Sequence, residues 1–158
     1  MSSSSRFGPW VEPHLLAMTR LAVRLVSVGD ADDVVQESLT RAWRRWRTYD
    51  QTRGSPRSWL LSIFADQARR HRTRFRPSQV ILVDSLGGRP DVDVAAVTDL
   101  NRAVQGLSSR QRLAVELHYF VGLPVKECAE AMSCSEGTVK STLSDARRRL
   151  ALMLEVKI

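Results

Sequence analysis

Apolar residues recur at spacings of three and four along most of this chain, and that spacing constrains the fold more than any other feature. In one segment they fall at Leu15, Met18, Ala22, Leu25 and Val26. An α-helix has 3.6 residues per turn, so this spacing gathers the apolar side chains on one helix face. The sequence therefore predicts an all-α fold.

Two further helices are predicted in the first half of the chain. Asp30 is placed to cap a helix over residues 31–47. Its apolar stripe consists of Val35, Leu39, Ala42, Trp43 and Trp46, and we expect both tryptophans in the core. Ser55 is placed to cap a third helix, with Pro56 in its first turn and its end near Arg74. The buried side of that helix would be formed by Trp59, Leu60, Ile63 and Phe64.

The middle of the chain divides it into two parts. Residues 75–93 contain two prolines and two adjacent glycines and match no helical period. They indicate a loop, and we expect residues 76–93 to form a flexible linker. The predicted architecture is two small helical domains, residues 10–75 and 94–158, with residues 1–9 as a disordered tail.

Helix boundaries are well marked after the linker. A helix that begins near Val94 would end at Gly106. Ser108 and Gln111 form the capping-box pattern that starts the next helix, and Gly122 would close it. These signals predict a second, compact set of short helices.

A helix-turn-helix is predicted at the end of the chain. Pro124 opens a short helix, a turn follows at residues 133–135, and Ser135 caps a long last helix. This spacing places Ala129 and Val139 where the two helices cross. Because Ser133 occupies the turn position at which glycine is usual, we expect a less sharply left-handed backbone there.

The last helix carries small polar and basic residues opposite its apolar stripe. The stripe consists of Val139, Leu143, Ala146 and Leu150, and the outward face of Gly137, Lys140, Ser141, Ser144 and Arg148. Small polar residues followed by arginine suit a helix whose first turns enter a DNA major groove while later residues hold phosphates. The pattern thus favours DNA binding.

The charge of the chain is basic and uneven. Residues 1–75 carry 13 basic and 7 acidic side chains, residues 76–99 carry 2 and 4, and residues 100–158 carry 9 and 6. Arginine outnumbers lysine 21 to 3, and its planar guanidinium pairs with phosphate through two parallel hydrogen bonds. Nucleic acid is therefore favoured over a membrane surface as the partner, although composition alone also fits a solvated basic face.

The sequence shows no sign of catalysis, of a cofactor or of export. Its three histidines are dispersed, no His and Cys spacing suits zinc, and no Gly-rich phosphate loop is present. We therefore expect no enzyme activity, no metal and no cofactor. The lack of a long apolar run and of a signal-peptide pattern predicts a cytoplasmic protein without membrane contact. Cys128 and Cys134 are expected to be small buried hydrophobes.

Three blocks of the sequence resemble the extracytoplasmic-function (ECF) group of the sigma-70 family, bacterial factors that direct RNA polymerase to promoters. One is GDADDVVQESLTRAW at residues 29–43, similar to region 2.2, where the family docks on core RNA polymerase. Another is WLLSIFADQARRHRTR at residues 59–74, similar to regions 2.3 and 2.4, which open and read the minus-ten element. The third spans residues 107–150, contains GTVKS and resembles region 4, which reads the minus-thirty-five element.

The resemblance implies three sets of site residues and an anti-sigma factor as a further partner. The polymerase-binding set is Asp32, Asp33, Gln36, Glu37 and Thr40. The set for minus-ten DNA, as duplex and as melted single strand, is Tyr49, Arg53, Gly54, Ser55, Arg57, Ser62, Asp66, Arg69, Arg70 and Thr73. The set for minus-thirty-five DNA is Ser135, Gly137, Thr138, Lys140, Ser141, Ser144, Arg147 and Arg148. Asp66 and Asp145 depart from the family pattern and either determine promoter specificity or face solvent.

Two other functions compete with this interpretation. A two-component effector can also carry TVK in its helix-turn-helix, but its first half would alternate strands and helices, and nothing before Asp93 does so. A nucleic-acid-processing enzyme with a basic helical body would need metal-binding acids or a nucleophile cluster, which this sequence does not supply. Transcription in vitro distinguishes the three, because a sigma factor makes core polymerase initiate, an activator needs holoenzyme and a nuclease degrades the template.

Overall fold

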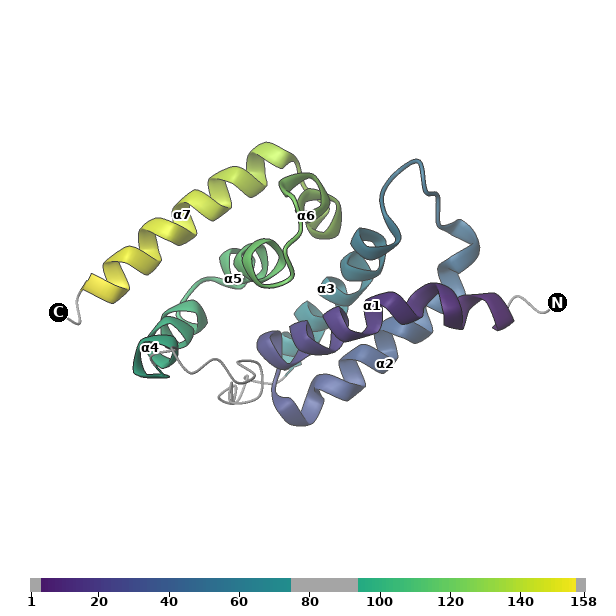
Figure 1. Cartoon of the computed structure of the whole chain (residues 1–158), viewed down its shortest axis with the longest axis horizontal. Helices are drawn as coiled ribbons and strands as arrows, with labels where there is room; N and C mark the ends of the chain where they lie inside the picture. The colour runs from purple at the N-terminus through teal and green to yellow at the C-terminus, as the bar shows by residue number, and fades with distance from the viewer. Residues whose placement is uncertain (1–3, 75–93, 156–158) are drawn as a thin grey trace.

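The structure, a computed structural model, describes residues 4–74 and 94–155, and within those ranges every regular element is a helix. Helices α1 (Ser4–Leu25), α2 (Val28–Arg45) and α3 (Pro56–Arg74) form an N-terminal bundle (Figure 1). Helices α4 (Val94–Gln105), α5 (Ser109–Val115), α6 (Val125–Met132) and α7 (Glu136–Glu155) form a C-terminal bundle. A 3₁₀ turn η1 (Trp46–Thr48) follows α2, and a π-helix η2 (Glu116–Phe120) extends α5. The predicted all-α fold is confirmed, and the expected linker lies outside the described residues.

Helix α1 begins earlier than the sequence pattern indicated. It includes residues 4–9, so the predicted disordered tail is wrong for those positions. Phe7 is buried, with its ring centroid 5.7 Å from that of Trp46 and 6.0 Å from that of Trp10. Packing of this side chain supplies the stabilisation that a serine-rich start lacks by itself.

Most of the predicted helix caps are present. The Ser55 hydroxyl accepts a hydrogen bond from the Ser58 backbone N–H at 3.1 Å. Ser108 and Gln111 form the full capping box, in which each side chain accepts from the other residue's backbone N–H. The Ser135 hydroxyl accepts from the Thr138 backbone N–H at 3.1 Å. Local capping chemistry therefore sets these helix starts.

Asp30 does not cap α2, contrary to the sequence prediction. The N-cap is Ser27, and α2 already begins at Val28. The Asp30 carboxylate instead accepts a hydrogen bond from the Ser27 hydroxyl and lies 3.1 Å from His71 Nε2 of α3. These contacts lower the pKa of Asp30, the Ser27 hydrogen bond being the larger cause. The residue ties α2 to α3 from inside the first turn.

The turn of the helix-turn-helix is left-handed despite its serine. Ser133 has φ 53° and ψ 47°, so the expectation of a less left-handed backbone is wrong. In this conformation the Cys134 N–H reaches the Ala129 carbonyl at 3.0 Å, which closes the end of α6. Ala129 and Val139 are both buried at the crossing, as predicted. Geometry of the motif thus overrides the residue's own preference.

The N-terminal bundle buries one apolar face of each helix. Met18, Leu60 and Phe64 are fully buried, but Trp43 is 50% exposed, so its predicted core position is wrong. Ala42 takes the central position on α2, and Trp43, about 100° further round the helix, points away from the bundle. Trp46 is half-buried within an aromatic cluster that also contains Trp10, Tyr49 and Trp59.

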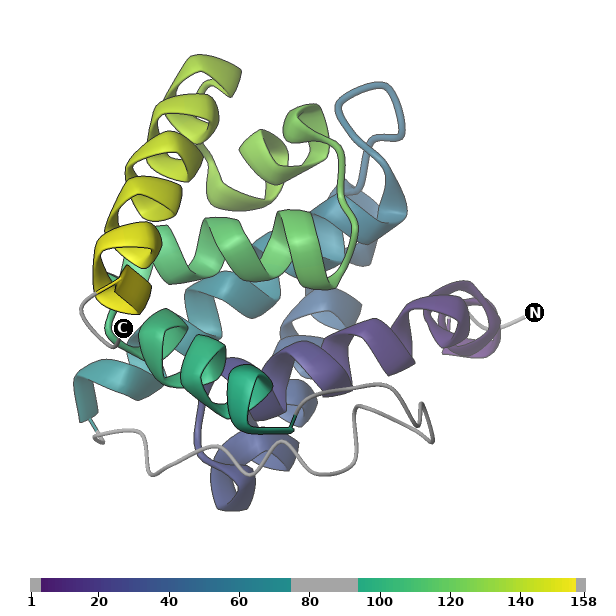
Figure 2. The same cartoon turned by 60° about the vertical axis from the view of Figure 1, so that its left-hand side comes forward.

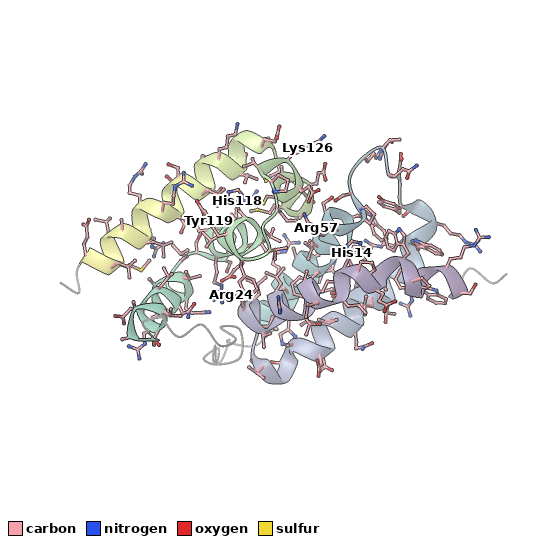
Figure 3. The ribbon with its side chains drawn as sticks, in the orientation of Figure 1. His14, Arg24, Arg57, His118, Tyr119 and Lys126 are labelled. Carbon is pink, nitrogen blue, oxygen red and sulfur yellow. The ribbon has the colours of Figure 1, made fainter. Side chains whose placement is uncertain are left out.

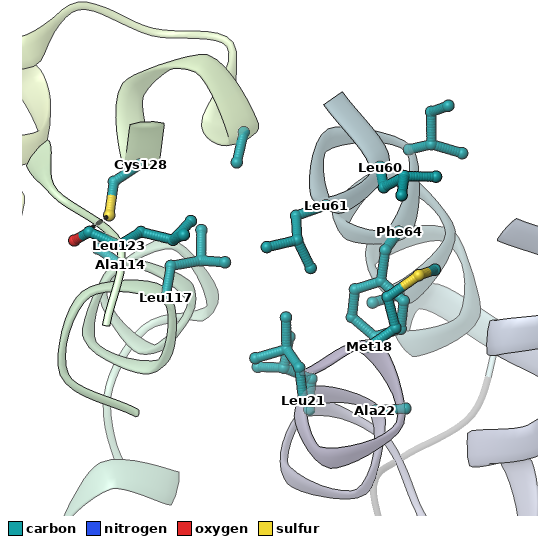
Figure 4. Close-up of a cluster of buried hydrophobic side chains, with 14 of the residues drawn as sticks. Met18, Leu21, Ala22, Leu60, Leu61, Phe64, Ala114, Leu117, Leu123 and Cys128 are labelled. Atoms are coloured by element: carbon teal, nitrogen blue, oxygen red, sulfur yellow. Dashed lines mark hydrogen bonds between the residues drawn. The ribbon is translucent and has the colours of Figure 1, made fainter. Parts of the chain in front are cut away.

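The two bundles pack directly against each other, which a pair of independent tethered domains did not predict. Helix α6 lies along α3, and η2 lies against α1 (Figure 2). Leu61 of α3 points toward Leu117 and Leu123 of the C-terminal bundle, and Leu21 of α1 lies beside them (Figure 4). All four side chains are almost completely buried. The apolar cores of the two bundles therefore form one continuous cluster.

Candidate nucleic-acid and polymerase interfaces

The predicted polymerase-binding residues share an exposed face of α2. Asp32, Asp33, Gln36, Glu37 and Thr40 are all exposed. Glu37 pairs with Arg41 at 3.0 Å, and the Thr40 hydroxyl donates to the Gln36 carbonyl at 2.9 Å. Both contacts span one helical turn on the surface, and all five side chains remain exposed to a partner.

Trp43 lies next to this face and not in the predicted core. It follows Thr40 at a spacing of three residues and Gln36 at a spacing of seven, and residues at these spacings lie on the same side of a helix. The same spacing thus also fits an exposed position, which the presence of a large aromatic on an apolar stripe does not exclude. An exposed indole beside acidic and amide groups adds apolar contact area to the face.

The predicted minus-ten loop is held by an aromatic residue beneath it. The Tyr49 hydroxyl donates to the Gly54 carbonyl at 3.0 Å, and its ring centroid lies 5.2 Å from that of Trp10 and 5.4 Å from that of Trp59. Tyr49 thus packs under the loop. Burial, followed by the charges of Asp50 and Glu130, raises the pKa of its phenol, so the hydroxyl stays protonated and can donate.

Other residues of the predicted minus-ten set, in the loop and at the start of α3, contact α6. Arg57 donates from Nη2 to Glu127 Oε2 at 3.0 Å, and Figure 3 shows Arg57 beside α6. A Cβ added to Gly54 would lie 2.9 Å from Glu130 Oε2, so this glycine permits a close approach of the Glu130 carboxylate. Ser55 is engaged as the cap of α3, whereas Arg53 is largely exposed.

The predicted minus-ten residues of α3 lie on its solvent side and along a groove between the bundles. Asp66, Arg69 and Arg70 are exposed, and Asp66 pairs with Arg69 at 3.2 Å. The Ser62 hydroxyl donates to the Trp59 carbonyl at 2.7 Å. The side chain of the remaining predicted residue, Thr73, lies outside the described part of the chain.

The groove has a volume of about 530 Å³. Asp66 and Arg69 form its α3 wall, while Arg110 of α5 and Ser133, which follows α6, face them. A space of this size matches small-molecule pockets and is too small for a nucleic-acid strand that runs along α3. The α3 face and the C-terminal bundle therefore line one partly open groove in this arrangement.

Helix α7 presents its predicted DNA-facing residues to solvent. Val139, Leu143 and Ala146 are buried against the rest of the bundle. The exposed residues on the other side are Ser135, Gly137, Lys140, Ser141, Ser144, Arg147 and Arg148, and Thr138 is half-buried. Arg147 donates to the Tyr119 hydroxyl at 2.8 Å, and Arg148 lies 3.4 Å from Asp145. The helix thus offers its first turns and two later arginines on one accessible side.

The cysteines and histidines do not form a reactive site in the described residues. No group of three or more His, Cys, Asp or Glu side chains there is arranged to hold a metal ion. Cys128 is fully buried, and burial raises the pKa of its thiol to about 11, so the group stays protonated at neutral pH. Cys134 is half-buried. None of the helices that the structure describes is long and apolar enough to cross a membrane.

Comparison with protein families covers both bundles. Residues 10–77 match Sigma-70 region 2, and residues 98–150 match Sigma-70, region 4. The two matches correspond to the N-terminal bundle and to the greater part of the C-terminal bundle. They include α2, α3 and α7 as far as Leu150, the three helices that carry most of the predicted site residues.

Similar proteins extend the match over nearly the whole chain. The ECF RNA polymerase sigma factor SigL of Mycobacterium tuberculosis is 30% identical over 152 residues, which covers 91% of this chain and 86% of SigL. The RNA polymerase sigma-E factor of Streptomyces coelicolor is 31% identical over 156 residues, covering 95% of this chain and 86% of that protein.

Solved structures show the same arrangement of helices. The sigma factor RpoE in complex with the anti-sigma factor NepR, from Bartonella quintana, superposes with a TM-score of 0.75 at 27% identity, over 96% of this chain and 98% of RpoE. CnrH in complex with the cytosolic domain of CnrY superposes with a TM-score of 0.73 at 26% identity, over 96% of this chain and 89% of CnrH. Together with the sequence matches over both bundles, these similarities show that the chain belongs to the extracytoplasmic-function sigma factors of the sigma-70 family.

Proposed function

We propose that this chain binds core RNA polymerase through the α2 face and directs it to a specific set of promoters. One observation carries the proposal: a single chain presents an exposed acidic face on α2 and an exposed basic face on α7. The acidic face suits a basic protein surface, and the basic face suits phosphates. A protein that bridges polymerase and DNA needs both.

The minus-thirty-five element is read by α7 in this proposal. Gly137, Ser141 and Ser144 are small enough to let the helix approach base edges in the major groove. Lys140 and Arg148 lie on the same side and hold backbone phosphates, which fixes the helix in register without selecting sequence.

The minus-ten element is opened and held by the loop before α3 and by the first turns of α3. Catching an unpaired base returns about 1 to 3 kcal/mol by stacking or pocket burial, which offsets part of the cost of melting. Tyr49 supports the loop from below, and Arg57 supplies a cation for the strand's phosphates. The arginines at the end of α3 add further phosphate contacts.

The two-component effector alternative finds no support. Its strand-and-helix first half has no counterpart in residues 4–74, which contain helices only. Those residues instead match a sigma-factor region. We assign no catalytic step to the chain, so the polymerase supplies the chemistry of RNA synthesis.

An anti-sigma factor and a cytoplasmic location complete the proposal. The similar protein RpoE was solved in complex with the anti-sigma factor NepR. We expect an analogous partner to hold this chain away from polymerase. A protein that works on polymerase and chromosomal DNA acts in the cytoplasm.

Charge reversal on α2 tests the docking face. The variant Asp33→Lys with Glu37→Lys should lose at least tenfold in affinity for core polymerase, because two attractive charges become repulsive. The matched control Glu12→Lys with Glu155→Lys makes the same charge change at exposed residues of α1 and α7 and should bind as the wild type does.

Two readouts complete that test. Copurification with core polymerase measures docking, and run-off transcription from promoters mapped after overproduction measures initiation. Equal retention of polymerase by the variant and the control would show that α2 is not the docking face. Failure of the wild-type chain to make core polymerase initiate would contradict the proposed function as a whole.

A further inference from the structure

A large aromatic side chain stands exposed next to the side of α7 that carries the predicted DNA contacts. Tyr119 of η2 is 56% exposed, and its hydroxyl accepts a hydrogen bond from Arg147 Nη1 at 2.8 Å (Figure 3). Arg147 is among the residues predicted for minus-thirty-five DNA, whereas Tyr119 is not. The tyrosine therefore adjoins the proposed DNA-binding surface from a different helix.

The π-helix turns Tyr119 outward. This residue follows Val115 by four positions and Arg112 by seven, and both of those residues are buried. In an uninterrupted α-helix, residues at these spacings share one face, so Tyr119 would point into the bundle. The Val121 N–H instead bonds the Glu116 carbonyl at 2.9 Å, five residues back, and this wider turn rotates the tyrosine to the surface. Single π-turns within helices are frequent at functional sites.

A neighbouring histidine holds the Tyr119 ring in place. His118 Nδ1 lies 2.8 Å from the Leu123 carbonyl oxygen, and because a carbonyl can only accept, Nδ1 carries the proton and donates it. The centroids of the His118 and Tyr119 rings are 4.8 Å apart with 72° between the ring planes, an edge-to-face arrangement. The backbone thus orients the histidine, and the histidine supports the tyrosine that carries the exposed hydroxyl.

The hydroxyl and the guanidinium together offer the donors that a DNA phosphate requires. Arginine has no acceptor, so Arg147 is the donor in this pair, and the Tyr119 hydroxyl keeps its own proton for another acceptor. The second N–H of Arg147 Nη1 is likewise not used by the tyrosine. Because the nitrogen and the hydroxyl oxygen are 2.8 Å apart, both can donate to oxygens of the same phosphate.

Arg147 brings this pair to the same side of α7 as other predicted contacts. It follows Lys140 by seven residues and Ser144 by three, and residues at these spacings share a helix side. All three are exposed. Seven residues correspond to about 10 Å along a helix, so the pair and Lys140 would meet different phosphates.

We propose that Tyr119 binds DNA, and that its hydroxyl and the Arg147 guanidinium form a phosphate clamp on the backbone of the minus-thirty-five duplex. The proposal rests on the proposed function for the contact of α7 with DNA. The clamp adds affinity and fixes α7 in the groove without selecting the base sequence. It also extends the surface to η2, because every residue predicted for minus-thirty-five DNA lies at or after Ser135.

Removal of the hydroxyl alone tests the clamp, with a duplex that carries the minus-thirty-five element of a promoter mapped after overproduction. Tyr119→Phe keeps the ring and should weaken binding about fivefold, the value of one hydrogen bond. The salt slope should not change, because no charge is lost, whereas Arg147→Ala should reduce that slope by about 1. In an Arg147→Ala chain, Tyr119→Phe should cost less than about twofold, since the two residues act together. The control Thr19→Val removes an exposed hydroxyl of α1 and should bind as the wild type does.

A scan of the DNA backbone separates phosphate binding from a role of the hydroxyl in the fold. Each phosphate near the element is replaced in turn by an uncharged methylphosphonate. One position should cost the wild-type chain affinity, cost Tyr119→Phe and Arg147→Ala less, and cost the double variant nothing. The thermal midpoint of free Tyr119→Phe should equal that of the wild type, because the hydroxyl is at the surface.

The outcomes distinguish the clamp from the proposed function. Wild-type affinity in Tyr119→Phe would overturn the clamp, and the proposed function would stand if Lys140→Ala with Arg148→Ala still weakens binding. Equal penalties in the wild type and Tyr119→Phe at every methylphosphonate would also overturn the clamp, because the hydroxyl would then support the fold and not a phosphate. Duplex binding that is independent of Lys140, Arg147 and Arg148 would contradict both proposals.

Discussion

We propose that α3 and α7 both bind DNA, but their proposed binding residues differ in exposure and in contacts within the chain. On α7, Lys140, Ser141 and Ser144 are exposed to solvent. At the start of α3, Arg57 and Ser58 bond the carboxylates of α6, and Ser58 is fully buried. Of the two helices that we propose to bind DNA, one is exposed to solvent and the other is engaged within the chain.

This difference shows that one chain can carry two proposed binding faces of which one is exposed and the other is in contact with residues of the same chain. In the proposed function, α7 would engage the minus-thirty-five element without any rearrangement of the free chain. In the proposed function, contact of the start of α3 with the minus-ten element requires Arg57 and Ser58 to release the carboxylates of α6. The bundles must then part by a rigid-body movement, a usual way in which packed domains switch between states.

The largest effect is expected from the buried ion pair between Arg24 and Glu116, which joins the two bundles. Replacement Arg24→Ala leaves the Glu116 carboxylate buried without its partner and should lower the free energy of unfolding by about 3 kcal/mol. Urea denaturation measures this loss. The control Arg20→Ala removes an exposed arginine of the same helix and should change stability by less than about 0.5 kcal/mol. Equal effects of the two variants would mean that Glu116 does not depend on Arg24.

A smaller effect is expected from substitutions on the exposed face of α7. Lys140→Ala with Arg148→Ala should weaken promoter-duplex binding about tenfold and reduce the salt slope by about 2, because two phosphate contacts are lost. Polymerase binding should not change. The control Arg20→Ala with Arg102→Ala removes two exposed cations elsewhere.

Fluorescence anisotropy over a salt series measures both quantities for α7. The loss of affinity should be the same whether the chain carries the wild-type Glu127 and Glu130 or the substitutions Glu127→Lys and Glu130→Lys. The face of α7 is exposed to solvent in both cases. A loss of affinity confined to the chain with Glu127→Lys and Glu130→Lys would contradict the view that α7 is accessible while the two bundles are packed together.

The smallest effect is expected from a half-buried contact inside the N-terminal bundle. Asp30→Asn removes the carboxylate that lies beside His71 and should slightly lower the thermal midpoint at neutral pH. The pKa of Asp30 is lowered from 3.8, so its stabilisation is present above pH 3.8 and is lost as the pH falls through the lower folded value. Thermal melts at pH 7 and pH 2.5 check the sign, since the difference from the wild type should vanish at the acid pH. A constant difference at both values would rule out ionisation of Asp30 as the cause.

Local signals in the sequence predicted much of the fold. The caps at Ser55, Ser108 and Ser135 are interactions over three residues, so the pattern alone specifies them. The outward face of α7 follows in the same way, because burial of Val139 and Leu143 leaves the opposite side to solvent. The family resemblance then gave these faces a function.

The features that the sequence did not predict depend on contacts between distant residues. Phe7 becomes helical because Trp46 and Trp10 cover it, and no local pattern announces that packing. The ion pair between Arg57 and Glu127 joins residues 70 positions apart in the chain, and each residue alone resembles an ordinary surface charge. Trp43 is an error of a different kind. The helical period of α2 is predicted correctly, but the period alone does not determine which edge of the apolar stripe faces outward.

The distance between the bundles before and after polymerase binding tests the account most directly. A donor and an acceptor dye can be placed at Thr52→Cys in the loop and Arg149→Cys in α7, in a chain with Cys128→Ala and Cys134→Ala. The free chain should show high energy transfer, and addition of core polymerase should lower it sharply as α6 leaves the loop. Undiminished transfer in a chain that is bound to polymerase and initiates transcription would contradict the account.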